Sequence, residues 1–535
     1  MKLRNIFLLA LSFSFIGCGF GNQDISTIVK IENGSIKGVQ EGNLKKYLGI
    51  PYAEPPVGNL RWASARPALN WEGIKSAESN SKICFQPKQI ADFYDRVPDI
   101  NNMSEDCLTL NVWTRAKITD EKLPVMVWFH GGALVWGRGS EYPGDARTEH
   151  GVILVTVNYR LGPFGFFSHP ELSAKTGSSG NQGFSDQIQS LKWVKENISQ
   201  FGGDPNNITI FGESAGSWSV NVLQASPLAK GLFHKAIGQS GARLIPLTHL
   251  NKRTTYSKSA EELGLDWSKV MAGKNTPSLK ELKKIPPKII ISNLEKDPLY
   301  TTQFDSLTVI DGTIIPEDIS KIFERGEQAD VPILIGSTAD EATPFDPKML
   351  SPQLASMSYK RLTHLAIDDM LPEVDSNIYD LYPIDTEEIA KNSWVEFSTD
   401  AMFTAQMQKW GSLMSSVESP AYLYFCNWYP SINGSKDFKA FHAAEVPYIF
   451  GNFDVFDIDV SVKDLNFSKI MMEIWTSFAK DGKPSLVKEE WPIFDPDSQR
   501  YVLLDENIEV KDSFRTRKVR LINEAYDKVR NNFED

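Results

Sequence analysis

The segment ITIFGESAGS, residues 208–217, places Ser214 between two glycines in the pattern Gly-x-Ser-x-Gly. A serine in this pattern can be an activated nucleophile that attacks a carbonyl carbon and forms a covalent acyl intermediate. The pattern alone is weak evidence, because it arises by chance in roughly one chain in five of this length. The alternative is a small residue in a Gly-rich turn, and the rest of the sequence has to decide between the two.

The residues around Ser214 favour the nucleophile. An apolar β-type run, ITIF, precedes it, and Val220 and Leu223 follow it at helical spacing. A strand, a sharp turn and a helix form the setting in which a serine is held exposed as a nucleophile elbow. The two glycines then have a steric function, because the tight turn needs residues without bulk on either side of the serine.

A serine hydroxyl also needs a base, normally a histidine that a carboxylate orients. In the strand-turn-helix arrangement the chain order is Ser, acid, His, so the base must follow a late strand. Of the seven histidines, His442 alone fits, since it comes after the strand-like segment AYLYFCNWY. Chain order, closeness to Ser214 or a helical setting excludes the others, which are His130, His150, His169, His234, His249 and His364.

Two further segments supply the remaining parts of a hydrolase site. VPILIGSTADEATPF offers Asp340 and Glu341 just past a strand end, and chain order allows either to orient the imidazole. VWFHGGALVWG follows a strand that ends at Phe129 and can bring backbone N–H donors close to the reacting carbon. We expect His130 in this segment to be structural.

The elements that must position these residues follow an α/β pattern. Apolar β-rich runs alternate with helical periodicity, which predicts a mostly parallel sheet buried on both faces. The predicted strands are 123–129, 152–157, 208–211, 235–239, 331–336 and 421–425, with a helix over 185–201. The polar, helical stretches 250–330 and 347–420 are expected to form insertions that wall a pocket. We interpret residues 24–535 as one catalytic domain.

Composition excludes several classes of partner. The chain has 535 residues and a net charge of −12, and no Lys/Arg stripe with interleaved aromatics, so nucleic acid is not an expected partner. No cofactor or metal is expected, because Asp454, Asp457 and Asp459 lack metal-ligand spacing. The sequence predicts no oligomeric state.

The N-terminus has the anatomy of a signal peptide. Lys2 and Arg4 precede an apolar run from Ile6 to Ile16 that is too short to span a bilayer. Cys18 follows at a position that resembles a bacterial lipobox, so we predict a signal segment over 1–17 and lipidation of Cys18 in the cell envelope. The alternative is ordinary secretion after cleavage nearby.

The other three cysteines divide into a pair and a single thiol. Cys84 and Cys107 lie close in sequence and can close a loop as a disulfide on the exported side. Cys426 lies in a predicted buried strand, which favours a packed, inert thiol.

Nearly the whole mature chain resembles the type B carboxylesterase family, which includes the cholinesterases and the non-catalytic neuroligins. The resemblance lies in YLGIPYAEPPVGNLRW, SEDCLTLNVW, HGGALVWG, NYRLGPFGF, GNQGFSDQIQSLKWVKENISQFGGDPNNITIFGESAG, IGQSG, STADEATPF and FHAAEVPYIFG. It implies an α/β-hydrolase fold and a bacterial serine hydrolase that acts through an acyl-enzyme on small or medium uncharged carboxylic esters.

The resemblance also implies roles for individual residues. The implied nucleophile, acid and base are Ser214, Glu341 and His442, which favours Glu341 over Asp340. The implied oxyanion N–H donors are Gly132, Ala133 and Ala215. Glu213 and Ser240 match family positions beside the triad. Cys84–Cys107 matches a family disulfide, and two buried ion pairs are implied, Arg61–Glu105 and Arg160–Asp186.

Departures from the family pattern narrow the expected substrates. No tryptophan stands between Cys84 and Cys107, so choline esters are not expected. Ala342 replaces the usual glycine after the acid, which is expected to shift its loop slightly. Ala133 keeps its N–H donor, and the wide segment around it suggests turnover of tertiary-alcohol esters. The alternatives are a non-catalytic binding protein on this fold and a narrower aryl or feruloyl esterase, lactonase or carbamate hydrolase.

Overall fold

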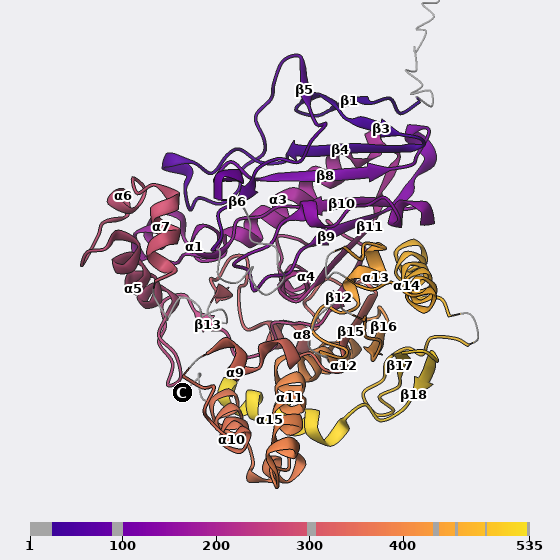
Figure 1. Cartoon of the computed structure of the whole chain (residues 1–535). Helices are drawn as coiled ribbons and strands as arrows, with labels where there is room; N and C mark the ends of the chain where they lie inside the picture. The colour runs from indigo at the N-terminus through magenta and orange to yellow at the C-terminus, as the bar shows by residue number, and fades with distance from the viewer. Residues whose placement is uncertain are drawn as a thin grey trace, which may run out of the picture.

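A computed structural model describes residues 24–87, 100–296, 307–351, 353–431, 438–454, 458–486 and 489–531. The predicted signal segment 1–17 and Cys18 lie outside these residues. An 11-stranded sheet runs through the centre in the order β18-β17-β16-β15-β12-β11-β9-β10-β8-β4-β3 (Figure 1). Its strands are β3 (Val39–Glu41), β4 (Leu44–Pro51), β8 (Thr109–Thr114), β9 (Leu123–Phe129), β10 (Ile153–Val157), β11 (Gly203–Glu213), β12 (Lys235–Gln239), β15 (Ile333–Thr338), β16 (Ala421–Cys426), β17 (Tyr501–Leu504) and β18 (Glu509–Lys511).

The sheet is parallel at its centre and antiparallel at its edges. Strands β10, β9, β11, β12, β15, β16 and β17 pair in parallel, whereas β3, β4, β8 and β18 pair antiparallel to their neighbours. The carboxyl ends of β9, β11, β12 and β15 therefore meet at one edge, where open α/β sheets bind their ligands. The segments that follow these strands are those in which the sequence predicts the site.

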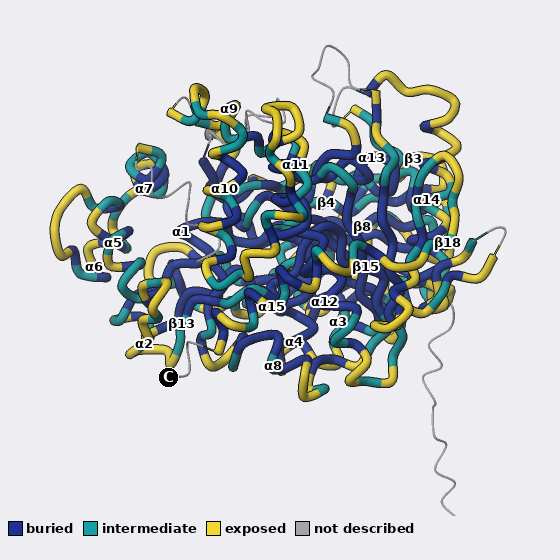
Figure 2. Tube along the Cα trace, turned by 90° about the horizontal axis from the view of Figure 1, so that it is seen from below, coloured by how far each residue is buried: buried dark blue, intermediate teal, exposed yellow. Residues whose placement is uncertain are grey.

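Helices cover both faces of the sheet. They are needed on both, because successive apolar side chains of a strand point to opposite faces. In β9, Val125, Val127 and Phe129 pack into the same cluster as residues of α3 (Gln182–Asn197), α4 (Ala215–Ala225) and α12 (Ala405–Leu413). Met126 and Trp128 pack on the other face with α13 (Val446–Phe450) and α14 (Val462–Asp481). Figure 2 shows the central strands buried in the middle of the molecule, whereas the edge strands β3 and β18 are more exposed. The prediction of strands buried on both faces is confirmed.

The remaining helices lie largely in the polar stretches. They are α1 (Gly162–Gly165), α2 (Pro170–Thr176), α5 (Ala260–Ala272), α6 (Leu279–Leu282), α7 (Pro287–Leu294), α8 (Ile319–Glu324), α9 (Pro347–Leu350), α10 (Tyr359–Met370), α11 (Glu387–Thr399) and α15 (Thr516–Asn531). Helices α5 to α7 form a group at one end of the molecule and α10 and α11 pack as a pair (Figure 1). A π-helical turn, Asp400–Thr404, joins α11 to α12.

Several predicted boundaries differ from the structure; strand β11, for example, spans Gly203–Glu213 instead of 208–211. Two of the differences have local reasons. Strand β15 begins at Ile333, two residues later than expected, because Pro332 has no N–H to donate to a neighbouring strand. Helix α3 begins at Gln182, three residues before the predicted start, and ends at Asn197, followed by a 3₁₀ turn over Ile198–Phe201. The first turn of the helix contains Gly183, where a larger residue would collide with Phe166 and with the backbone of Arg160.

Smaller sheets and covalent links complete the structure. These sheets are β1 (Ile28–Ile31) with β2 (Gly34–Lys37) and β5 (Ile74–Ser76), β6 (Ile83–Cys84) with β7 (Met103–Ser104), and β13 (Thr248–His249) with β14 (Val309–Ile310). Cys84 and Cys107 form a disulfide, and Cys426 is a buried free thiol. A disulfide is typical of exported proteins. Within the described segments, no helix has the length and apolarity to cross a membrane.

Both expected ion pairs are present; Arg160–Asp186 is fully buried and Arg61–Glu105 is largely buried. Arg61 contacts Glu105 at 2.6 Å, and Arg160 contacts Asp186 at 2.6 Å with both side chains at most 3% exposed. Arg61 also donates to the carbonyl oxygens of Leu282 and Ile285, which ties the α6 region to the body of the protein.

Candidate active site

Ser214 stands in a sharp turn between β11 and α4. Its backbone has φ 57° and ψ −124°, a region that L-residues rarely occupy, at a cost on the order of 1–3 kcal/mol. The two positions that flank Ser214 in the motif, Gly212 and Gly216, have no room for a side chain. A Cβ on Gly212 would lie 2.4 Å from the carbonyl carbon of Gly216, and a Cβ on Gly216 would lie 2.0 Å from the oxygen of Phe129. The strand-turn-helix setting predicted for Ser214 is therefore present.

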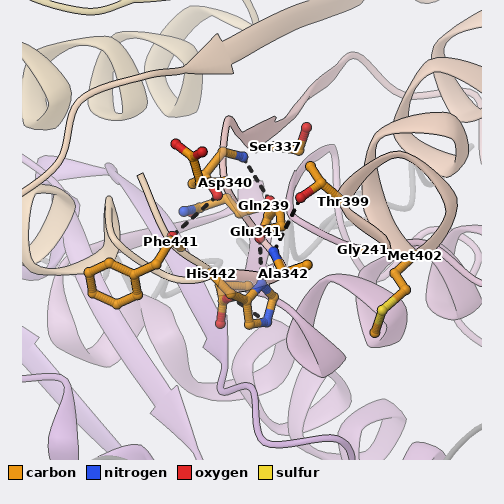
Figure 3. A network of polar contacts seen from close by, with 12 residues as sticks. Gln239, Gly241, Ser337, Asp340, Glu341, Ala342, Thr399, Met402, Phe441 and His442 are labelled. Atoms are coloured by element: carbon orange, nitrogen blue, oxygen red, sulfur yellow. Dashed lines mark hydrogen bonds and ion pairs between the residues drawn. The ribbon is translucent and has the colours of Figure 1, made fainter. Parts of the chain in front are cut away.

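The carboxylate of Glu341 holds the imidazole of His442 (Figure 3). Nδ1 of His442 donates to Oε2 of Glu341 at 2.6 Å, and Oε1 of the same carboxylate accepts from the backbone N–H of Thr338 at 2.7 Å. Asp340 has a different partner, since its Oδ2 accepts from the N–H of Ala440 at 3.4 Å. Of the two acids that chain order left open, the structure brings Glu341 to His442.

Ala342 fits its loop without strain, although a glycine is usual there in the family. Its backbone is helical, with φ −83°, so the Cβ carries no conformational cost. Its N–H donates to Oγ1 of Thr399 at 3.2 Å, which holds the acid's loop against the end of α11 (Figure 3).

A second carboxylate lies on the other side of the imidazole. Nε2 of His442 is 3.1 Å from Oε1 of Glu213, the residue before Ser214. In the described part of the chain, Oγ of Ser214 makes no hydrogen bond, and Nε2 of His442 faces Glu213 instead. Hydrogen bonds between catalytic groups are often long without substrate and tighten only in the complex.

Aromatic rings complete the surroundings of His442. The ring of Phe403 lies 4.6 Å from the imidazole and that of Phe345 lies 5.4 Å from it. Phe403 belongs to the π-helical turn, and such turns are frequent at functional sites. Both rings therefore pack against the imidazole of His442, which is 4% exposed.

The segment 130–137, called here the oxyanion segment, packs directly on Ser214. A Cβ on Gly131 would lie 3.2 Å from Cβ of Ser214 and 2.9 Å from Oε2 of Glu213. Gly132 and Ala133 have φ values of 105° and 53°, which turn the chain sharply at this point. Within the described residues, the N–H groups of Gly132, Ala133 and Ala215 donate to no protein acceptor. These three donors are available to a ligand.

His130 is buried as a structural residue at the start of this segment. Its ring stacks on Tyr159 with centroids 4.4 Å apart, and the Tyr159 hydroxyl donates to the His130 carbonyl at 2.7 Å. Burial lowers the pKa of His130 to about 4, so its ring is neutral at ordinary pH. A neutral, stacked ring agrees with the structural role expected of it.

Burial and charge act in opposite directions on the titratable groups of the site. Burial by itself would lower the pKa of His442, but the carboxylates of Glu213 and Glu341 outweigh it and raise this pKa to about 9. Burial raises the pKa of Glu213 to about 8, against the opposing charge of His442. Because each shift depends on the charge of the other group, His442 and Glu213 titrate as a coupled pair, which holds a proton near neutral pH.

Several residues beside the site were not singled out from the sequence. Glu445, one turn after His442, is fully buried and accepts from Nε2 of Gln239 at 3.0 Å, while Oε1 of Gln239 accepts from Trp475 at 3.0 Å. Burial raises the pKa of Glu445 to about 7. Ser240, which the resemblance to the family did single out, follows Gln239 and is also buried, with φ 53°. Phe403 and Glu445 gave no sequence signal, because their contacts join residues far apart in the chain.

Comparisons with known proteins agree with this geometry. The model of the carboxylesterase family matches residues 25–522. The chain belongs to the carboxylesterase family. It is 36% identical to a para-nitrobenzyl esterase of Bacillus subtilis, over 90% of this chain and 96% of that protein. It is 32% identical to liver carboxylesterase B-1 of Rattus norvegicus, over 92% of each chain.

Solved structures establish the fold in the same way. A para-nitrobenzyl esterase structure superimposes with a TM-score of 0.80 at 33% identity, covering 93% of this chain and 99% of the other. A carboxylesterase of Geobacillus stearothermophilus superimposes with a TM-score of 0.79 at 29% identity, covering 93% and 100%. The chain therefore has the α/β-hydrolase fold and is a serine carboxylic-ester hydrolase, as its resemblance to the family implied. Nothing in these comparisons supports a non-catalytic binding protein.

Proposed function

We propose that Ser214 is the nucleophile, His442 the general base and Glu341 the acid that orients it. The hydrogen bond of 2.6 Å between Glu341 and His442, beside a serine in a strained elbow, carries this proposal. Glu341 fixes the tautomer with the proton on Nδ1, which leaves Nε2 free to accept a proton. Glu213 competes for Nε2 and sets the pH at which the base becomes free.

Two half-reactions follow from these roles. In the first, the Ser214 proton passes to Nε2 of His442 as Oγ attacks the ester carbonyl, and the N–H groups of Gly132, Ala133 and Ala215 bind the oxyanion. His442 then gives its proton to the departing alcohol, leaving an acyl group on Ser214. In the second, His442 takes a proton from water as the water attacks the acyl carbon, and it then gives that proton to Oγ of Ser214 as the C–Oγ bond breaks and the carboxylic acid leaves. No step uses a cofactor or metal.

The proposed substrates are small or medium uncharged esters. The imidazole packs against both Phe345 and Phe403, and the acidic side chains of Glu213, Glu341 and Glu445 lie near it, so an anionic ester is expected to meet unfavourable charge. Residues 24–535 are proposed to form one hydrolase domain, and the N-terminal sequence suggests export with lipidation at Cys18.

Hydrolysis of p-nitrophenyl acetate and butyrate tests the proposed function. The purified chain should release p-nitrophenol from both esters, and Ser214→Ala should lose about 10⁶-fold in turnover while unfolding at the same temperature. Equal and negligible rates in two folded proteins would contradict the proposal.

A further inference from the structure

The side chain of Gln86 joins the disulfide-bonded segment to the oxyanion segment. Gln86 lies two residues after Cys84 and is 3% exposed. Its Nε2 donates to the carbonyl oxygens of Cys84 and Gly137, each at 3.1 Å, and its Oε1 accepts from the Gly137 N–H at 2.9 Å. One buried amide thus holds both backbone polar groups of Gly137, a residue 51 positions along the chain.

Gly137 in turn lies against the start of the oxyanion segment. Its φ is 114°, and a Cβ there would lie 2.4 Å from Nδ1 of His130 and 2.8 Å from the oxygen of Gly131. A Cβ on Gly132 would lie 2.1 Å from the oxygen of Trp136. The two ends of the segment are therefore in direct contact, and a shift at Gly137 displaces the backbone at Gly131 and Gly132.

The other end of the Gln86 contact is fixed. Cys84 ends β6, which pairs with β7, and its sulfur is bonded to Cys107. Because the amide of Gln86 is buried, releasing Gly137 would leave donors and an acceptor without partners, which is unfavourable. The disulfide-bonded segment and the oxyanion segment are thus held together by the Gln86 amide.

We propose that Gln86 is a positioning residue for the oxyanion hole, an inference that rests on the function proposed above. Gln86 touches no substrate and acts through Gly137. By holding Gly137, it keeps the N–H groups of Gly132 and Ala133 aimed at the carbon that Ser214 attacks. The oxyanion exists only in the transition state and the tetrahedral intermediate, so loss of this alignment lowers kcat more than it alters KM.

Kinetics of Gln86→Leu in the full-length chain tests the proposal. Leucine removes all three hydrogen bonds with little change in volume. With p-nitrophenyl butyrate, kcat should fall by roughly 10- to 100-fold and KM should change by less than about threefold, because a small misplacement of catalytic groups costs up to about 10² in rate. The inhibition constant of an alkyl trifluoromethyl ketone should rise by a similar factor, since its adduct with Ser214 places an oxyanion in the hole.

Gln328→Leu provides a matched control. Gln328 is also buried, at 1% exposure, and its Nε2 donates to Oγ of Ser416 at 3.1 Å. It precedes β15, at the opposite edge of the sheet from Ser214. The Gln328→Leu variant should keep kcat and the affinity for the trifluoromethyl ketone within about twofold of the unmodified chain, because distant sites act largely independently.

Gln86→Glu is a second variant that keeps the shape of the side chain. Its carboxylate still accepts from the Gly137 N–H but has no donor for the carbonyl oxygens of Gly137 and Cys84. This variant should therefore also lower kcat and weaken the binding of the trifluoromethyl ketone. Unchanged kcat and ketone affinity in both variants would overturn the inference. Loss of cooperative unfolding in both would also overturn it, because Gln86 would then hold the fold as a whole.

The test separates this inference from the proposed function. An active unmodified chain, whose activity Ser214→Ala abolishes, together with unaffected Gln86 variants overturns the role of Gln86 alone. An unmodified chain without Ser214-dependent activity overturns both.

Discussion

Nε2 of His442 lies 3.1 Å from Oε1 of Glu213, while its Nδ1 lies 2.6 Å from Oε2 of Glu341. The imidazole therefore has a carboxylate at each nitrogen, and both favour the imidazolium. A general base must be neutral to accept the Ser214 proton. The arrangement consequently makes the activity sensitive to pH, in a direction that the raised pKa of His442 sets.

The first prediction concerns this pH dependence. Because the pKa of His442 is raised to about 9 from 6.5, kcat/KM should fall as the pH drops through a midpoint well above 6.5. Glu213→Gln removes one of the two carboxylates and should move that midpoint to lower pH. The measurement is kcat/KM for an uncharged, non-ionising ester such as ethyl butyrate from pH 5 to 10. An identical midpoint in both proteins would show that Glu213 does not act on the base.

The second prediction separates the two neighbouring acids. Glu341→Gln should lower kcat by about 10⁴-fold, because the amide no longer fixes the imidazole tautomer or stabilises the imidazolium. Asp340→Asn is the control, since the asparagine oxygen can still accept from Ala440. It should retain kcat within a small factor. If Asp340→Asn were the more damaging change, the assignment of the acid would be wrong.

The third prediction concerns stability. Arg160→Met leaves Asp186 buried without a charged partner and should destabilise the chain by about 3–5 kcal/mol. Arg253→Met breaks an exposed pair with Glu262, in which Arg253 is 63% exposed, and should cost less than about 1 kcal/mol. Urea denaturation followed by tryptophan fluorescence measures both. Similar midpoints for the two variants would contradict the structural role of the buried pair.

The fourth prediction concerns bulky alcohols. The wide segment around Ala133 resembles that of hydrolases which accept bulky alcohols, so esters of tertiary alcohols are expected to enter the site. tert-Butyl acetate should be hydrolysed at a measurable rate that Ser214→Ala abolishes. The absence of detectable hydrolysis by a chain that is active on ethyl acetate would reject this expectation.

Much of the fold and site follows from local sequence pattern. The continuous apolar run LPVMVWF predicts a strand buried on both faces, and the structure has β9 over the same residues. The strand, glycine-serine turn and helix around Ser214 are likewise local, so sequence alone places that residue at an elbow. The resemblance to the family, rather than local pattern, chose Glu341 over Asp340.

Other features depend on contacts that no local pattern contains. Phe403 reaches His442 because α11 continues through a π-helical turn, and Gln86 reaches Gly137 across 51 residues. The competition of Glu213 for Nε2 of His442 depends on a side-chain orientation in three dimensions. Such contacts become visible only when the sheet has brought its carboxyl-end segments together.

Covalent labelling most directly tests the claim that Ser214 is the nucleophile. The full chain would be treated with a fluorophosphonate, and its intact mass, its peptide map and its residual esterase activity would be measured together. One adduct per chain is expected on the peptide that contains Ser214, with activity lost in proportion to labelling. Activity that persists in the fully labelled protein, or is lost through an adduct on another residue, would contradict it.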